Sequence, residues 1–213
     1  MVDLVQIAHT LQDGRAQEAS DLIIQALEED YTVEDILSQG LRAGMISLEQ
    51  RFRSQAISIP QVLIALRAMH AAMRILKPLL LHSGSGVKGI VVIGTVPGDL
   101  HDIPKNLMSI MMESLGLRVI DLGIGVSPER FIEVVKQEPV HIIVCTAELI
   151  ITMPQLKLLV EAFDAPGIRD QVKIMISGAP VTEQYCRSIG ADFYAPDAIS
   201  AMRLAAAYYQ GQL

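Results

Sequence analysis

The chain has 213 residues, of which 17 are basic and 24 acidic, and its formal net charge is −7. This charge and the lack of a stripe of Lys and Arg argue against a nucleic-acid partner, because phosphate binding needs basic residues gathered on one face. The longest uncharged apolar runs are far shorter than the roughly 20 residues of a membrane-spanning helix, and the N-terminus shows no secretory signal pattern.

Cysteine content gives a further limit on the protein class. The sequence has two isolated cysteines, Cys145 and Cys186, which form neither a disulfide framework nor the ligand spacing of a zinc site. A mean hydropathy of +0.37 indicates much buried surface. We therefore expect a well-packed cytoplasmic protein with no membrane association.

The sequence up to residue 82 carries apolar residues at helical spacing and almost no strand-like alternation. The pattern predicts four helices, over residues 3–12, 15–30, 33–53 and 60–78. Pro60 suits the first turn of the fourth helix, where a missing N–H costs nothing. The apolar stripe of that helix consists of Val62, Leu66, Met69 and Met73. Four helices with short turns predict an antiparallel bundle over residues 1–82.

Residues 83–87 are rich in Ser and Gly and predict a flexible linker. Beyond it, short apolar runs alternate with amphipathic helices, which predicts a parallel sheet covered on both faces. The predicted strands are 88–95, 118–122, 141–145, 172–176 and 192–195. The predicted helices are 104–115, 128–137, 153–163, 181–189 and one after Asp197. Five strands fit a flavodoxin-like, that is Rossmann-like, α/β domain over residues 88–213.

Such sheets bind ligands beyond the carboxyl ends of their strands, where the strand order reverses. We therefore expect the loop after the first predicted strand, which contains Asp99 and His101, to lie beside the loop after the third predicted strand, residues 146–152. An imidazole can bind a metal through one nitrogen while the other donates to a carboxylate. A lone His would leave zinc without its usual three or four protein ligands. The pattern therefore favours a metal whose other positions are filled by a macrocycle.

Several blocks of the sequence share one known pattern: 94–103 with Lys105 and Asn106, then 152–154, 177–182, 189–192 and 194–198. These blocks resemble the D-x-H-x-x-G, S-x-L and G-G motifs of the corrinoid proteins of methylotrophic and O-demethylating methyltransferase systems. Those proteins are similar to the cobalamin module of methionine synthase, with a helical cap before a flavodoxin-like domain. The resemblance spans nearly the whole chain.

The resemblance implies a bound cobalamin whose cobalt has His101 as its lower ligand, in place of the cofactor's own base. Asp99 would accept from the other nitrogen of His101, and Thr152 would extend this proton relay. Further cofactor-binding residues implied in the same way are Gly98, Leu100, Asp102, Ile103, Thr146, Glu148, Leu149, Ser177, Gly178, Ala195, Pro196, Asp197 and Ala198, with Val62, Leu66 and Met69 of the cap.

The resemblance also implies partners. The protein would carry a methyl group from a substrate:corrinoid methyltransferase to a methylcorrinoid:tetrahydrofolate or thiol methyltransferase, in O-demethylation or related one-carbon metabolism. A reductive activase would keep the cofactor active. One alternative is a cobalamin-dependent sensor that acts through protein contacts.

Four positions depart from the family pattern. Pro104 and Ser177 replace Gly, Thr146 replaces Ser and Glu148 replaces Leu. Pro104 cannot donate an N–H, and Glu148 brings a charge towards the expected channel for the nucleotide tail. Thr146 keeps the hydroxyl of Ser. Pro104, Glu148 and Ser177 leave open a second alternative, a relative without a cofactor that acts as a binding module.

Overall fold

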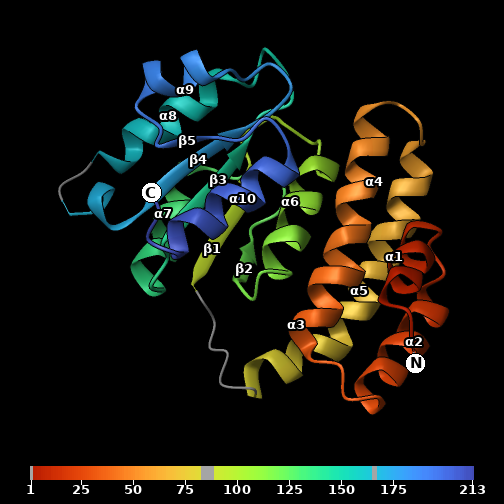
Figure 1. Cartoon of the computed structure of the whole chain (residues 1–213). Coiled ribbons are helices and arrows are strands. Elements are labelled where there is room, and N and C mark those ends of the chain that lie inside the picture. The colour runs from red at the N-terminus through yellow and green to blue at the C-terminus, as the bar shows by residue number, and fades with distance from the viewer. Residues whose placement is uncertain (1, 83–88, 165–166) are drawn as a thin grey trace. The chain divides into compact units, whose positions relative to one another are not determined.

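The structure, a computed structural model, describes residues 2–82, 89–164 and 167–213 (Figure 1). The chain forms two compact units. The first contains Met1–Val87 with Ser114–Gly116, and the second contains Lys88–Glu113 with Leu117–Leu213. The linker predicted over residues 83–87 lies outside the described residues.

The first unit is built from helices, as the apolar spacing predicts. Asp3 caps the first helix, because its carboxylate accepts from the N–H of Val5 at 2.9 Å. The apolar stripes are buried, and helices α1, α2, α4 and α5 pack against one another. The elements are α1 Leu4–Gln12, α2 Ala16–Glu28, α3 Val33–Asp35, the π-helical segment η1 Ile36–Arg42, α4 Ala43–Arg53 and α5 Ile59–His82.

The helix predicted over residues 33–53 has the expected span but not the expected regularity, since η1 interrupts it. Gly40 and Gly44 lie on the side that packs against α1. A Cβ at Gly44 would lie 3.0 Å from the Cα of Ala8, and one at Gly40 would lie 3.2 Å from Cγ2 of Ile7. Small residues thus let the two helices approach closely.

Helix α5 extends past Pro78 to His82, beyond the expected end. By length and composition alone, its residues 59–76 are apolar enough to cross a membrane. A buried core helix meets the same criterion, and Val62, Leu66, Met69 and Met73 of α5 are all buried.

The second unit contains a five-stranded parallel sheet with the order β2-β1-β3-β4-β5. This order is that of the flavodoxin-like fold and confirms the predicted fold class. The strands are β1 Ile90–Thr95, β2 Arg118–Asp121, β3 Ile142–Thr146, β4 Lys173–Ser177 and β5 Phe193–Tyr194. The helices are α6 Ile103–Glu113, α7 Pro128–Gln137, α8 Pro154–Phe163, the 3₁₀ turn η2 Arg169–Gln171, α9 Glu183–Ile189 and α10 Ala198–Tyr209.

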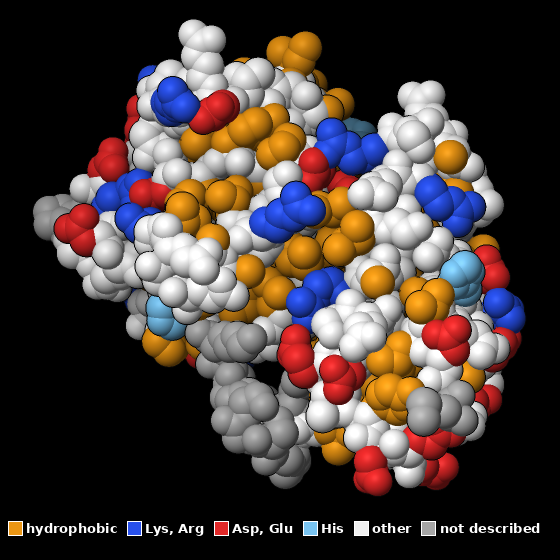
Figure 2. All heavy atoms as spheres, in the orientation of Figure 1, with side chains coloured by type: hydrophobic (Ala, Val, Ile, Leu, Met, Phe, Trp, Pro, Cys, Tyr) orange, Lys and Arg blue, Asp and Glu red, His pale blue; other side chains and the backbone are white. Residues whose placement is uncertain are grey.

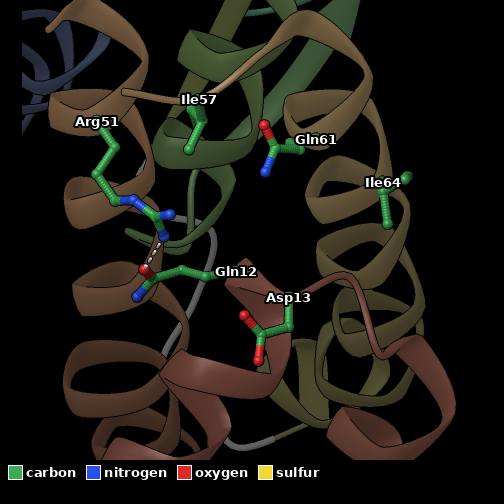
Figure 3. A pocket seen from close by; sticks show the side chains of 6 residues that line it. All are labelled: Gln12, Asp13, Arg51, Ile57, Gln61 and Ile64. Carbon is green, nitrogen blue, oxygen red and sulfur yellow. Dashed lines mark hydrogen bonds between the residues drawn. The ribbon is translucent and has the colours of Figure 1, made fainter. Parts of the chain in front are cut away.

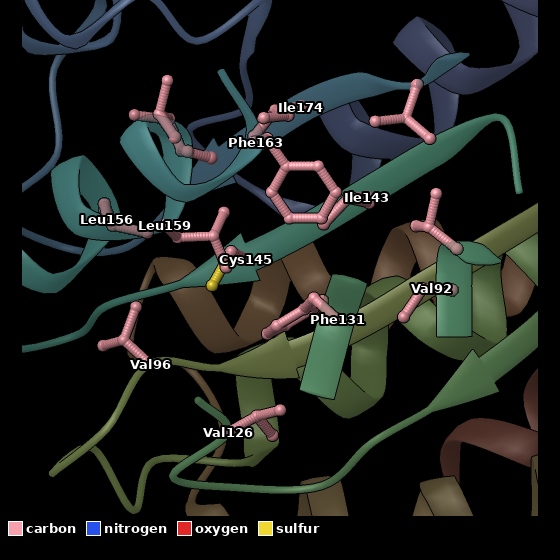
Figure 4. Packing of buried hydrophobic residues seen from close by; sticks show 14 of the residues in the cluster. Val92, Val96, Val126, Phe131, Ile143, Cys145, Leu156, Leu159, Phe163 and Ile174 are labelled. Carbon is pink, nitrogen blue, oxygen red and sulfur yellow. The ribbon is translucent and has the colours of Figure 1, made fainter. Parts of the chain in front are cut away.

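The core of this unit lies between the sheet and helices α7, α8 and α9 (Figure 4). Every residue of β1 and β3 is buried, as expected for central strands of a sheet covered on both faces. Phe131 of α7 and Phe163 of α8 fill the space over Val92, Ile143 and Cys145. This packing fixes the strand ends from which the loops of the candidate site emerge.

Figure 2 shows one face of the molecule, on which side chains of both charges are exposed. Lys and Arg side chains there are interspersed with acidic, apolar and neutral ones.

Candidate functional site

The loop after β1 turns sharply and buries one carboxylate beneath an imidazole. Gly98 has a positive φ of 82°, a conformation that glycine adopts without strain. Asp99 follows with no exposed surface, whereas the side chain of His101 is 53% exposed. The hydroxyl of Thr95 donates to the carbonyl of Asp99 at 2.7 Å, which anchors the turn to the end of β1.

Both carboxylate oxygens of Asp99 accept hydrogen bonds. Oδ1 accepts from the N–H of His101 at 3.0 Å and lies 2.8 Å from its ring nitrogen Nδ1. Oδ2 accepts from the N–H of Glu148 at 2.6 Å and from the hydroxyl of Thr152 at 2.9 Å. Because β1 and β3 are adjacent, residues 99–101 and 148–152 meet at the same sheet edge, as predicted.

The environment of Asp99 decides its charge. Burial by itself raises the pKa of the Asp99 carboxyl. Hydrogen bonds from the N–H and ring of His101, from Glu148 and from Thr152 outweigh that effect, so the pKa of Asp99 lies below its ordinary value of 3.8. An ionised carboxylate 2.8 Å from Nδ1 of His101 favours the tautomer with its proton on Nδ1, and in that tautomer Nε2 is the nitrogen that can bind a metal.

The ligand set available to such a metal is small. Among the described residues, no group of three or more His, Cys, Asp or Glu side chains is placed to hold an ion. A metal at Nε2 of His101 would therefore take most of its ligands from a non-protein group. A corrin ring supplies such ligands, so the donor set fits cobalt in a macrocycle.

Exposed aliphatic side chains lie on the same two loops as the Asp99–His101 pair. Leu100, Ile150 and Ile151 are 71%, 76% and 83% exposed. Ile150 and Ile151, with Leu149, Glu148, Ala179 and Pro180, line an open and mostly apolar pocket of about 550 Å³. Exposed apolar clusters of this kind mark binding surfaces, and a broad hydrophobic ring fits this one.

The ends of the central strands form a row of hydroxyl groups. Thr95, Thr146 and Ser177 are partners in register across β1, β3 and β4, and all three are buried. The hydroxyl of Thr146 has no hydrogen-bond partner in the structure. A buried polar group without a partner is costly, and the nucleotide tail expected beside Thr146 would supply one.

Gly178 follows this row in a conformation only glycine fits. Its φ is 141°, and a Cβ there would lie 1.8 Å from the carbonyl oxygen of Ala147. The loop after β4 therefore approaches the loop after β3 very closely. The remaining predicted tail residues, Ala195, Pro196, Asp197 and Ala198, follow β5 at the same edge, where Asp197 caps α10 by accepting from the N–H of Ser200.

The other predicted cofactor-binding residues fall in two places. Gly98, Leu100, Asp102 and Ile103 belong to the loop after β1 or to the first residue of α6. Val62, Leu66 and Met69 lie on α5 of the helical unit and are buried, and their contact with a corrin ring stays a prediction.

Two of the departures from the family pattern have a structural account. Pro104 lies in the first turn of α6, where its missing N–H costs no helical bond. The carboxylate of Glu148 accepts from the N–H of Ala179 at 3.0 Å and so connects the loops after β3 and β4. Burial raises the pKa of Glu148 above its ordinary value.

A second pocket lies within the helical unit (Figure 3). Its polar groups are already paired: Arg51 donates to the Gln12 side chain at 3.3 Å, the Gln61 side chain accepts from Ser58, and Asp13 forms an ion pair with Arg15. With a volume of about 190 Å³, this pocket is too small for a macrocycle.

Sequence reasoning missed two groups around the loop after β1. Thr95 reads as the last residue of a buried strand, yet its hydroxyl holds Asp99. Lys105 belongs to the first motif block, which indicates no role for its side chain, yet it is buried and lies 2.5 Å from Asp121. Neither contact has a spacing signal, because each joins segments that only the fold brings together.

Comparison with known proteins also points to cobalamin binding. The family model described as "B12 binding domain" matches residues 89–203, and a second model with the same description matches residues 4–77. The dimethylamine corrinoid protein of Methanosarcina barkeri is 36% identical over 181 residues, which cover 84% of this chain and 85% of that protein.

Two solved structures are similar over nearly the whole chain. A cobalamin-binding protein from Desulfitobacterium hafniense DCB-2 has a TM-score of 0.74 and 27% identity, covering 98% of this chain and 99% of that one. The methanol:cobalamin methyltransferase complex of Methanosarcina barkeri gives a TM-score of 0.72 and 25% identity, covering 96% and 78%.

Proposed function

This chain belongs to the corrinoid proteins of methyltransferase systems, which bind cobalamin and carry methyl groups, and from that premise we propose that His101 is the lower axial ligand of the cobalt. The observation that carries the proposal is the half-exposed imidazole held on a fully buried carboxylate, Asp99, at 2.8 Å. The cofactor's own base would then be displaced, and its tail would reach the unpaired hydroxyl of Thr146.

The chain's own residues hold and aim this ligand. A bound corrinoid supplies a cobalt centre that accepts and releases a methyl group. Asp99 keeps the proton on Nδ1 of His101 and prevents rotation of the ring. The Thr152 hydroxyl, which also lies 3.0 Å from the carbonyl of Leu149, donates to Asp99 because an ionised carboxylate is the stronger acceptor. A proton released or gained at this pair would pass through these three side chains.

Corrinoid proteins work with methyltransferases, as the methanol:cobalamin methyltransferase complex illustrates. For this chain we propose two such partners in the cytoplasm, one that methylates the cofactor and one that removes the methyl group to tetrahydrofolate or a thiol. A reductive activase would restore oxidised cofactor. The relatives are named for dimethylamine and trimethylamine, so methylamine methyltransferases are the first partners to test, before O-demethylases.

Reconstitution with cobinamide tests the ligand assignment. Cobinamide has no nucleotide base, so a nitrogen ligand below its cobalt must come from the protein. We expect a visible spectrum of nitrogen-coordinated cobalt with the native chain and with the control His9→Ala, whose imidazole is exposed on α1. His101→Ala should bind cobinamide without that spectrum. An identical spectrum in His101→Ala would contradict the proposal.

Methyl transfer separates a carrier from a cobalamin-dependent sensor. The loaded protein is mixed with a methylamine:corrinoid methyltransferase and its substrate, and methylation of the cobalt is followed by absorbance. Transfer with any tested partner supports a carrier. Stable cobalamin binding without transfer, across methylamine, methanol and methoxyaromatic methyltransferases, would favour the sensor.

A further inference from the structure

Lys105 is a buried cation in the first turn of α6, only 2% exposed. Its ammonium lies 2.5 Å from Oδ2 of Asp121, at the end of β2, and donates to Oδ1 of Asn106 at 2.7 Å. A buried ammonium is costly unless it is paired and hydrogen-bonded. Because this burial is costly, we expect Lys105 to have a role that an exposed lysine would not have.

One side of this interaction reaches the C-terminal end of the His101 loop, residues 96–102. The side-chain amide of Asn106, whose oxygen accepts from Lys105, donates to the carboxylate of Asp102 at 3.2 Å. The backbone N–H of Asn106 donates to the carbonyl of Asp102 at 2.8 Å. Lys105 thus holds the residue that directly follows the imidazole.

The other side reaches the N-terminal end of the same loop. Oδ1 of Asp121 accepts from the N–H of Gly123 at 2.8 Å, and the carbonyl of Gly123 accepts from the N–H of Thr95 at 3.1 Å. The hydroxyl of Thr95 accepts from Gly125 at 2.8 Å and donates to the carbonyl of Asp99. Asp121 therefore connects Lys105 to the N-terminal end of the loop, whereas Asn106 connects it to the C-terminal end.

We propose that Lys105 is a positioning residue for the cobalt ligand: its ion pair with Asp121 fixes one end of the His101 loop, its hydrogen bond to Asn106 fixes the other, and together they aim the imidazole. This inference rests on the proposed function, since it concerns the same ligand. It adds a residue that touches neither His101 nor the cofactor's metal and acts through Asp121, Asn106 and Thr95.

The test measures coordination and not activity. The variant Lys105→Met keeps the length of the side chain and removes the charge, and Lys157→Met, an exposed lysine paired with Glu161 on α8, is the matched control. Each protein is loaded with cobalamin and reduced to the cobalt(II) state, and EPR gives the ratio of histidine-bound to histidine-free cobalt. We expect Lys105→Met to lower this ratio about 10-fold, the lower end of the effect of outer-shell residues at metal sites.

Retention of the native ratio in Lys105→Met would overturn the inference, even if the variant were less stable, because a merely structural lysine would change stability alone. If Lys105→Met does not fold, Asp121→Asn keeps the shape of the pair and removes its opposite charge. That variant should lower the same ratio, and an unchanged ratio there would also overturn the inference. A native protein without histidine coordination would overturn both this inference and the proposed function.

Discussion

Asp99 combines full burial with four hydrogen-bond contacts, and this combination determines what His101 can do. An ionised carboxylate at Nδ1 fixes one tautomer and makes Nε2 a better metal ligand. The same carboxylate joins the loops after β1 and β3, so loss of any one contact affects both loop geometry and ligand orientation.

Two threonines at this edge should respond oppositely to the same substitution. Thr152→Val removes a hydroxyl that donates to buried Asp99, and we expect the cofactor-free protein to lose about 2 kcal/mol of unfolding free energy. Thr146→Val removes a buried hydroxyl without a partner, so stability should be unchanged or higher. Urea unfolding followed by circular dichroism measures both. A larger loss in Thr146→Val than in Thr152→Val would contradict the assignment.

Glu148 should make stability depend on pH. Its folded pKa is raised above the ordinary value of 4.5, so the folded state binds more protons there than the unfolded state does. Unfolding free energy therefore falls as the pH rises from about 4.5 through the folded pKa, and the cost of the ionised group persists above it.

The variant Glu148→Gln keeps an oxygen for the N–H of Ala179 and removes this titration. We expect it to be more stable than the native chain near about pH 7 and to lose that advantage below about pH 4.5. Urea titrations at the two pH values, with the exposed Glu161→Gln as control, measure the difference. If the stability advantage of Glu148→Gln over the native chain grew on acidification, burial of the ionised carboxylate would not be its cause.

At the scale of whole elements, patterning predicts most of the fold. Runs such as Ile90–Thr95 and Ile142–Thr146 are apolar throughout because both faces of a central parallel strand are covered. The candidate pair, Asp99 and His101, was predictable because loops after β1 and β3 meet wherever the sheet order reverses.

Other features have no local signal. The π-helical segment over Ile36–Arg42 packs against α1, and apolar spacing does not distinguish it from an α-helix. The buried ion pair of Lys105, on α6, needs Asp121, which lies 16 residues away at the end of β2. The contact of Glu148 with Ala179 likewise joins two loops.

At Gly178, in the loop after β4, the backbone geometry allows only glycine. We expect Gly178→Ala to destabilise the protein by about 3 kcal/mol, because strain from a positive φ adds to the clash with Ala147. Gly190→Ala also has a positive φ but meets no atom closer than 3.9 Å, so it should cost only about 1 kcal/mol. Thermal unfolding of the two variants compares them. Equal losses would show that the close approach of the two loops has no energetic weight.

At the scale of the whole molecule, both units match those of cobalamin-binding proteins. Separate B12-binding family models match residues 4–77 and 89–203, and the whole-chain similarity to the Desulfitobacterium hafniense protein covers both. The helical unit is thus part of the cobalamin-binding protein and not an unrelated addition, and its α5 residues Val62, Leu66 and Met69 are the positions at which to test contact with the corrin.

The central claim is that His101 coordinates the cobalt of bound cobalamin. Its most direct test is EPR of the cobalt(II) form in protein whose histidines alone carry the heavy isotope of nitrogen. The splitting from the axial nitrogen should change from the pattern of the common isotope to that of the heavy one, and the change should vanish in His101→Ala. An unchanged pattern in labelled native protein would mean that the cofactor keeps its own base, which would contradict the claim.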